Sequence, residues 1–240
     1  MVRLRGWVFS GLLVFNTIAG SLWSVALWLL PHPIRYFFAV RCWAVANLWL
    51  LRVICGLDWE VRGLRHLPKE PGVVLMKHSS AFDIIVQAAL FPRQAWLLKR
   101  ELLWVPLFGW ALAAIGCVGV DRARGARAVR GVVRDGKARI EQGLWVMVFP
   151  EGTRMAPGET GNYAPGGAMI ASAARCPVVP VAHNAGDYWP RRSASKKPGT
   201  ISIVIGPPLD SRSQNARELT QKAKTWIESE VIKLREVNTI

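Results

Sequence analysis

The stretch GVVLMKHSSAFD, residues 72–83, passes from an apolar run to a histidine and an aspartate that lie five positions apart. The run GVVLM has the composition of a short buried strand. Ser80 and Asp83 then form a capping-box-like S-x-x-D, which is typical of the first turn of a helix. The stretch therefore predicts a strand that ends near Met76 and leads through a short turn into a helix.

His78 and Asp83 support two interpretations. On one continuous helix, side chains five positions apart point about 140° away from each other, since each residue turns ~100°. A turn between strand and helix would instead let the Asp83 carboxylate curl back to the imidazole, as in a general base with an orienting carboxylate. The alternative is an ordinary strand end before a capped helix, where an aspartate suits the helix dipole. The seven residues 77–83 alone do not separate the two interpretations, and both can hold at once.

The chain beyond Asp58 continues this alternation of strand-like and helix-like segments. It predicts an α/β fold with a central β-sheet flanked by helices. In such sheets, functional groups gather where strands hand over to loops. Strands are expected at 72–76, 95–98, 117–120, 145–149, 178–182 and 201–205, and helices near 81–91, 102–114, 123–142, 164–174 and 213–236.

The N-terminal region has a different composition. Residues 6–34 carry no formal charge, and the apolar stretch 6–30 is longer than the ~20 residues that cross a bilayer as a helix. Two prolines then end the helix, and the next apolar segment carries Arg41 and Arg52, which fits a helix lying partly in the membrane interface. We expect residues 1–57 to form a two-helix membrane anchor and residues 58–240 an α/β catalytic domain. A helical core in a soluble protein is the alternative, and the sequence leaves open whether residues 6–30 span the bilayer or lie in it.

The overall composition favours a membrane as the anionic partner. The net charge is +15, hydrophobic residues make up 51% of the chain, and there are 12 tryptophans. A strongly basic chain attracts polyanions, and a basic, tryptophan-rich, apolar chain fits an anionic membrane surface better than it fits nucleic acid. A nucleic-acid-binding module is an alternative that rests on the charge alone.

A second motif, FPEGTR at residues 149–154, follows the expected strand 145–149. Arg154 offers a planar guanidinium suited to a phosphate, and Gly152 allows close approach of the backbone to a ligand. Glu151 is placed to accept hydrogen bonds from substrate hydroxyls or to hold the arginine. Lys99 and Arg122 follow other expected strands, so the strand ends together predict a site for a phosphorylated, hydroxyl-bearing substrate. A plain surface turn with a salt bridge is the alternative for FPEGTR, and the four histidines lack the spacing of a zinc site.

Four blocks resemble those of the bacterial 1-acylglycerol-3-phosphate acyltransferases, within the wider glycerolipid acyltransferase family. An H-x4-D block is common by chance, whereas H-x4-D followed by FPEGTR at this interval is a strong signal. The hydrophobic N-terminus is also similar to the membrane-docking element of some members. Two positions depart from the family pattern: Lys77 stands where asparagine is frequent, and Ala164 where many members have a lysine. The blocks are HSSAFD (78–83), KRELLWVPLFGWALAAIGCVGVDR (99–122), FPEGTR (149–154) and VVPVAHN (178–184).

The resemblance implies transfer of a fatty acyl chain from acyl-CoA or acyl carrier protein to the 2-hydroxyl of 1-acylglycerol-3-phosphate, giving phosphatidic acid for phospholipid biosynthesis. His78 would act as the general base, oriented by Asp83, without a covalent acyl-enzyme. Neither a metal nor a bound cofactor is implied. The resemblance assigns the phosphate and glycerol contacts to Lys99, Arg122, Glu151, Gly152, Thr153 and Arg154.

The resemblance also places the chain at the bacterial inner (cytoplasmic) membrane, with the catalytic domain on the cytoplasmic face. Related enzymes that use glycerol-3-phosphate, a lysophospholipid or an aminolipid as acceptor are alternatives within the family. A catalytically inactive membrane-binding relative is an alternative of another class.

Overall fold

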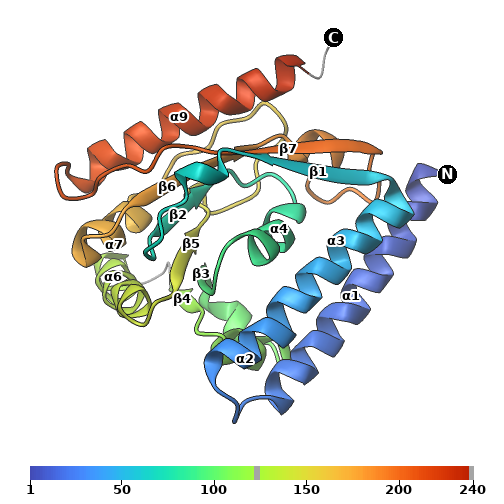
Figure 1. The fold of residues 1–240 in the computed structure, drawn as a ribbon, viewed down its shortest axis with the longest axis horizontal. Coiled ribbons are helices and arrows are strands. Elements are labelled where there is room, and N and C mark those ends of the chain that lie inside the picture. The colour runs from blue at the N-terminus through green and yellow to red at the C-terminus, as the bar shows by residue number, and fades with distance from the viewer. Residues whose placement is uncertain (122–124, 238–240) are drawn as a thin grey trace.

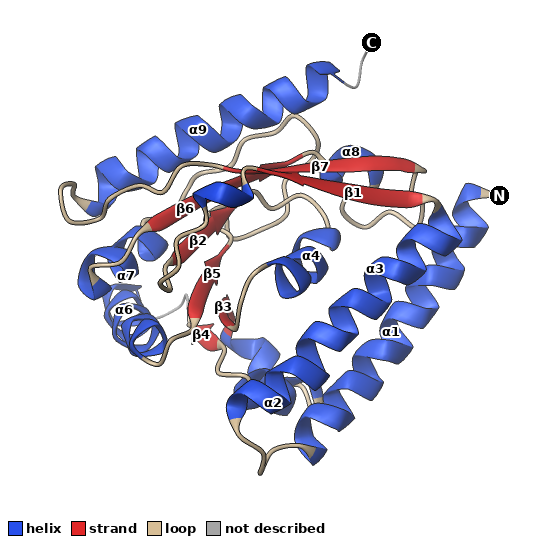
Figure 2. Ribbon diagram, in the orientation of Figure 1, coloured by secondary structure: helices blue, strands red, loops and turns tan. Residues whose placement is uncertain are grey.

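The computed structural model describes residues 1–121 and 125–237. Its centre is a seven-stranded sheet in the order β1-β7-β6-β2-β5-β3-β4, with helices on both faces (Figures 1 and 2). Neighbouring strands run parallel except β6 and β7, which are antiparallel. The predicted α/β fold is confirmed. The strands are β1 (Leu57–Arg62), β2 (Val73–Met76), β3 (Gln94–Lys99), β4 (Val118–Val120), β5 (Trp145–Val148), β6 (Val178–His183) and β7 (Gly199–Ile205).

The helices form one group on each face of this sheet. α6, α7 and α9 cover one face, and α1, α3 and α4 pack together against the other (Figure 1). The helices are α1 (Val2–Ala26), α2 (His32–Tyr36), the π-helical turn η1 (Phe37–Arg41), α3 (Cys42–Cys55), η2 (Leu64–His66), α4 (Phe82–Leu90), η3 (Arg100–Trp104), α5 (Phe108–Ala114), α6 (Gly125–Glu141), α7 (Gly166–Ala174), α8 (Ala185–Tyr188) and α9 (Ala216–Val237).

Strand β2 shows why its sequence is apolar at every position. Its four side chains are fully buried, with Val73 and Leu75 in the core beneath α7 and α9. Val74 and Met76 point to the other face and join the core formed with α3 and α4. Successive side chains of a strand alternate between faces, so a strand covered on both faces needs apolar residues throughout.

The short helices η2 and α8 were not predicted, and two further elements differ from the expectation. The helix expected near 102–114 is divided into η3 and α5, because Pro106 has no N–H to donate and Leu107 has a positive φ of 65°. Strand β1 was not predicted; its sequence LDWEVR mixes charged and apolar residues, as suits the edge strand that it is. Arg122, which the sequence analysis placed among the phosphate contacts, lies outside the described residues.

The N-terminal region forms two long apolar helical segments that lie side by side (Figure 1). Segments 2–26 and 32–55 are each long and apolar enough to cross a membrane, judged by length and composition. Their outward side chains include Trp7, Trp23 and Trp49, each more than half exposed.

Both ends of this helix pair are held by the sheet-containing part of the chain. At the N-terminal end of α1, the buried amine of Lys196 donates to Gly6 O (3.0 Å) and to Ser10 Oγ (2.8 Å). Near the opposite end, Arg35 Nη2 donates to Ala114 O (2.5 Å), and His32 Nε2 lies 3.2 Å from Ile115 O. The helix pair is therefore fixed along the sheet-containing part at two distant points.

Gly6 marks the closest approach at the Lys196 end and gives a testable prediction. A Cβ at Gly6 would lie 1.9 Å from Ala194 O, whereas a Cβ at Gly11, in the same helix, would meet nothing within 4 Å. Gly6→Ala should destabilise the protein by about 1–3 kcal/mol through overpacking. Gly11→Ala should be neutral or stabilising by up to about 1 kcal/mol, since alanine favours helix. Thermal unfolding in detergent measures both, and equal unfolding temperatures for the two variants would contradict this contact.

Candidate active site

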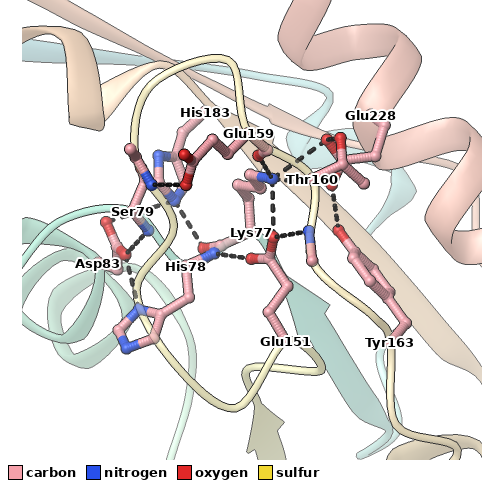
Figure 3. Close-up of polar contacts among 12 residues, drawn as sticks. Lys77, His78, Ser79, Asp83, Glu151, Glu159, Thr160, Tyr163, His183 and Glu228 are labelled. Carbon is pink, nitrogen blue, oxygen red and sulfur yellow. Dashed lines mark hydrogen bonds and ion pairs between the residues drawn. The ribbon is translucent and has the colours of Figure 1, made fainter.

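His78 lies in the turn between β2 and α4, and Asp83 lies in the first turn of α4. The expected contact is present: His78 Nδ1 is 2.9 Å from Asp83 Oδ2 (Figure 3). The same carboxylate oxygen accepts the backbone N–H groups of Ser79 (2.8 Å) and Ser80 (2.9 Å). The helix begins at Phe82, with Ala81 rather than Ser80 as its N-cap. Asp83 therefore both closes the turn and pairs with the imidazole, so the two interpretations of HSSAFD hold together.

The Asp83 carboxyl group is fully buried, and its charge depends on its neighbours. Burial alone would raise its pKa. The imidazoles of His183 and His78 and the N–H of Ser80 outweigh burial, so the pKa of Asp83 lies below its usual value of 3.8. Asp83 is thus an anion at neutral pH, able to hold a neighbouring imidazolium.

His183, at the end of β6, supports this carboxylate from behind. Its Nδ1 accepts the Ala185 N–H at 3.2 Å, so in the neutral ring the proton is on Nε2. Nε2 lies 2.8 Å from Lys77 O and 3.3 Å from Asp83 Oδ1. The buried His183 ring therefore fixes both the carboxylate and the backbone just before His78.

The His78 ring is oriented by stacking as well as by Asp83. It lies on the Phe149 ring with 3.9 Å between the centroids and 17° between the planes. Since Nδ1 faces Asp83, Nε2 is the nitrogen left for a substrate. His78 lines a cavity of about 1010 Å³, whose walls are mostly apolar and include Leu13 of α1, Val40 of η1 and Trp43 of α3.

Five of the six predicted phosphate and glycerol contacts line the same cavity, and the sixth, Arg122, lies outside the described residues. Lys99, Gly152, Thr153 and Arg154 line it together with His78. The buried Arg154 Nε has no hydrogen-bond partner among the described residues, so its N–H is available to donate to an anionic ligand. The backbone at position 152 has a φ of 66°, a conformation that glycine adopts without steric cost. The N–H of Gly152 donates to Phe149 O (2.9 Å).

Glu151 also lines the cavity, but its carboxylate is fully buried and bonded to other protein groups. Oε1 accepts from Lys77 Nζ (2.8 Å) and Gly161 N (3.3 Å). Oε2 accepts the backbone N–H of His78 (2.9 Å). Protein groups therefore occupy both oxygens, and the carboxylate holds the histidine backbone instead of facing a substrate hydroxyl.

Comparison with known proteins decides the family. A family model described as acyltransferase matches residues 58–184. The chain belongs to the acyltransferase family. This acyltransferase is 42% identical over 202 residues to a 1-acyl-sn-glycerol-3-phosphate acyltransferase of Pseudomonas aeruginosa, covering 83% of this chain and 79% of the relative. It is 28% identical to the human 1-acyl-sn-glycerol-3-phosphate acyltransferase alpha, covering 90% of this chain and 79% of the relative.

A solved structure shares the fold of this acyltransferase. The crystal structure of the 1-acyl-sn-glycerophosphate (LPA) acyltransferase PlsC from Thermotoga maritima superposes with a TM-score of 0.77 at 22% sequence identity. The match covers 98% of this chain and 95% of that structure. The N-terminal helices therefore belong to the shared fold.

Several residues of the site were not found as site residues by sequence reasoning: Lys77, Tyr163, His183 and Glu228. Lys77 left one visible signal, since a lysine directly after a fully apolar strand needs a partner where it is buried. Glu228 left none, because it lies in a charged C-terminal helix where one more glutamate is unremarkable by composition.

The lowered pKa of Asp83 predicts how stability depends on pH. The carboxylate stabilises the folded state above the usual pKa of 3.8, and this contribution is lost as the pH falls through the lower pKa of the folded state. Asp83→Asn should cost about 2–3 kcal/mol at pH 7, since it removes hydrogen bonds to a charged group. The difference between wild type and variant should shrink as the pH falls below 4. Denaturant unfolding between pH 3 and 7 tests this, and a constant difference would contradict it.

Proposed function

We propose that this acyltransferase moves a fatty acyl chain from a thioester to the 2-hydroxyl of 1-acylglycerol-3-phosphate, giving phosphatidic acid. One observation carries the proposal: the Asp83-paired His78 lies on the same apolar cavity as Lys99 and Arg154. A base, two cations and an apolar wall suit an acceptor with a hydroxyl, a phosphate and an acyl chain. The name of the Pseudomonas aeruginosa relative supports the same substrate.

The proposed reaction begins with proton transfer from the acceptor hydroxyl to His78 Nε2. The freed oxygen attacks the thioester carbonyl, and Asp83 stabilises the imidazolium that forms. When the tetrahedral intermediate collapses, the C–S bond breaks and the imidazolium returns its proton to the leaving thiolate. The acceptor supplies the nucleophile, so no acyl-enzyme forms. The acyl donor is acyl-CoA or acyl carrier protein as co-substrate, and the scheme needs neither a metal nor a bound cofactor.

Arg154 and Lys99 bind the acceptor phosphate in this proposal, with Thr153 beside the glycerol. Arg122 keeps its proposed role in the phosphate clamp, although it lies outside the described residues. Gly152 shapes the loop through its φ of 66°. Its N–H donates to Phe149 O and is therefore not directed at the oxyanion of the tetrahedral intermediate.

The N-terminal helices hold the enzyme at the membrane in this proposal. A 25-residue helix is ~37 Å long, enough to cross the hydrocarbon core. The N-terminal end of α1 is nevertheless bonded to the sheet-containing part through Lys196, and Arg35 of α2, beyond the other end of α1, is bonded to Ala114. A helix pair fastened in this way along a domain outside the bilayer lies along one leaflet. We place it on the cytoplasmic face of the bacterial inner membrane, where the basic surface meets anionic lipid.

The first experiment measures thioester consumption by purified protein in detergent, with 1-acylglycerol-3-phosphate as acceptor. Replacing His78 by alanine should lower kcat about 10²–10⁴-fold, because a general base is lost. Circular dichroism and thermal unfolding control for folding. Wild-type activity with glycerol-3-phosphate, a lysophospholipid or an aminolipid, but not with this acceptor, would change the assigned acceptor. It would leave the role of His78 as general base unchanged. Activity that survives the substitution would contradict the proposed role of His78.

Arg154 provides a separate test of phosphate recognition. Arg154→Gln removes a charged contact worth about 1.5–3 kcal/mol, so KM for 1-acylglycerol-3-phosphate should rise roughly 10–100-fold. The same substitution should leave the slow reaction with uncharged 1-acylglycerol nearly unchanged. Steady-state kinetics with both acceptors measure the difference, and an equal loss with both would mean that Arg154 does not read the phosphate.

A further inference from the structure

Lys77 is a buried lysine directly before the proposed base. Its side chain is 3% exposed, and its amine lies in a cluster of hydrogen-bond acceptors (Figure 3). The amine donates to Glu151 Oε1 (2.8 Å), to Glu159 O (2.9 Å), and to Glu228 Oε1 (2.9 Å) and Oε2 (3.1 Å). Glu228 comes from α9, so Lys77 joins two elements far apart in sequence.

The cluster is completely hydrogen-bonded although it holds two carboxylates and one amine. Tyr163 Oη donates to Glu228 Oε1 (2.8 Å), and Thr160 Oγ1 donates to Glu228 Oε2 (3.0 Å). With the Gly161 and His78 N–H groups on Glu151, each of the four carboxylate oxygens accepts at least one hydrogen bond. Buried charges are tolerated when they are paired and fully satisfied, and such clusters are rigid.

This cluster fixes the irregular segment 149–165, which runs between β5 and α7 and carries FPEGTR. Lys77 reaches it at Glu151 and at the carbonyl of Glu159. Met155 N also donates to His78 O (2.8 Å), and Ala164 N to Pro150 O (2.9 Å). The segment has no helix or strand of its own, so its position relative to the base depends on these contacts.

We propose that Lys77 and Glu228 are positioning residues for the acyl transfer. Through Glu151 they hold the backbone of His78, and through segment 149–165 they hold Arg154. The base and the phosphate-binding cation then face the same acceptor molecule. This proposal rests on the proposed function. It also explains why a lysine stands before the histidine: α9 brings a second carboxylate that only a cation can balance beside Glu151.

The charge balance predicts an order among the variants. Lys77→Gln leaves two buried carboxylates without their cation, which separates the segment from His78. Glu228→Gln leaves a balanced pair between Lys77 and Glu151 and should be milder. The double variant Lys77→Gln/Glu228→Gln carries one carboxylate instead of two, so it should be more active than Lys77→Gln alone. Glu230→Gln is the matched control, because Glu230 lies on the same helix and its ion pair among the described residues is with the exposed Lys233.

Steady-state kinetics with 1-acylglycerol-3-phosphate test this order. Lys77→Gln should lower kcat/KM roughly 100-fold, as expected for a misplaced base, with kcat lowered and KM for the acceptor raised. KM for the thioester should not change. Glu228→Gln should lose roughly 10-fold and the double variant should regain roughly 10-fold over Lys77→Gln, as coupled neighbours do. A loss of folded protein alone would lower kcat without this split, and Glu230→Gln should stay within about two-fold of wild type.

Hydrogen exchange separates this proposal from the proposed function, because it needs no substrate. Lys77→Gln should increase exchange at the His78 amide and across residues 149–165, and Glu230→Gln should not. If the wild type is inactive with 1-acylglycerol-3-phosphate and the variants still show this exchange pattern, the acceptor assignment is overturned and the positioning role of the cluster stands. If Lys77→Gln does not fold, Glu228→Gln carries the test. The proposal would be overturned if Glu228→Gln had the kinetics and the hydrogen exchange of the wild type. It would also be overturned if the double variant were no more active than Lys77→Gln.

Discussion

The site depends on the burial of one carboxylate. Asp83 is an anion with no access to water, and such a group is stable only when donors surround it. The turn supplies them: two backbone N–H groups and the His78 ring meet at Oδ2, and His183 lies behind Oδ1. Satisfying the carboxylate forces the chain into one turn conformation, and that conformation aims Nε2 of His78 at the cavity. Folding and chemistry therefore share the same hydrogen bonds.

Sheet pairing explains why two motifs more than 60 residues apart form one site. β2 and β5 are parallel neighbours, with Leu75 opposite Val148. Continuing both strands by three residues brings His78 beside Glu151, and the backbone N–H of the first donates to the carboxylate of the second. Parallel strands end at the same edge, so residues that directly follow them meet there. The spacing between H-x4-D and FPEGTR is set by the elements between them, but their contact is set by this pairing.

The same reasoning shows what the sequence can and cannot predict. The fold class, the β2–α4 turn and the approach of His78 to Asp83 follow from short stretches whose physical preferences agree. The orientation of Glu151 does not, because it depends on Lys77 and on Glu228, which lies 151 positions from Lys77. A glutamate beside an arginine in FPEGTR looks like a substrate ligand until the buried amine is known. β1 was also missed, since an edge strand needs no continuous apolar pattern.

The first helix shows how composition can describe a segment correctly and still leave out part of its role. Its hydropathy and exposed tryptophans fit a membrane anchor, yet Thr17, Gly20, Ser21 and Ser24 line the cavity that His78 also lines. The hydroxyls of Thr17 and Ser21 donate to carbonyls one turn earlier in α1, so they do not demand water or a polar ligand. Thr17 and Ser21, together with Gly20, therefore form a wall of small residues that leaves space for an apolar ligand. One face of α1 is thus part of the wall of the cavity that holds His78.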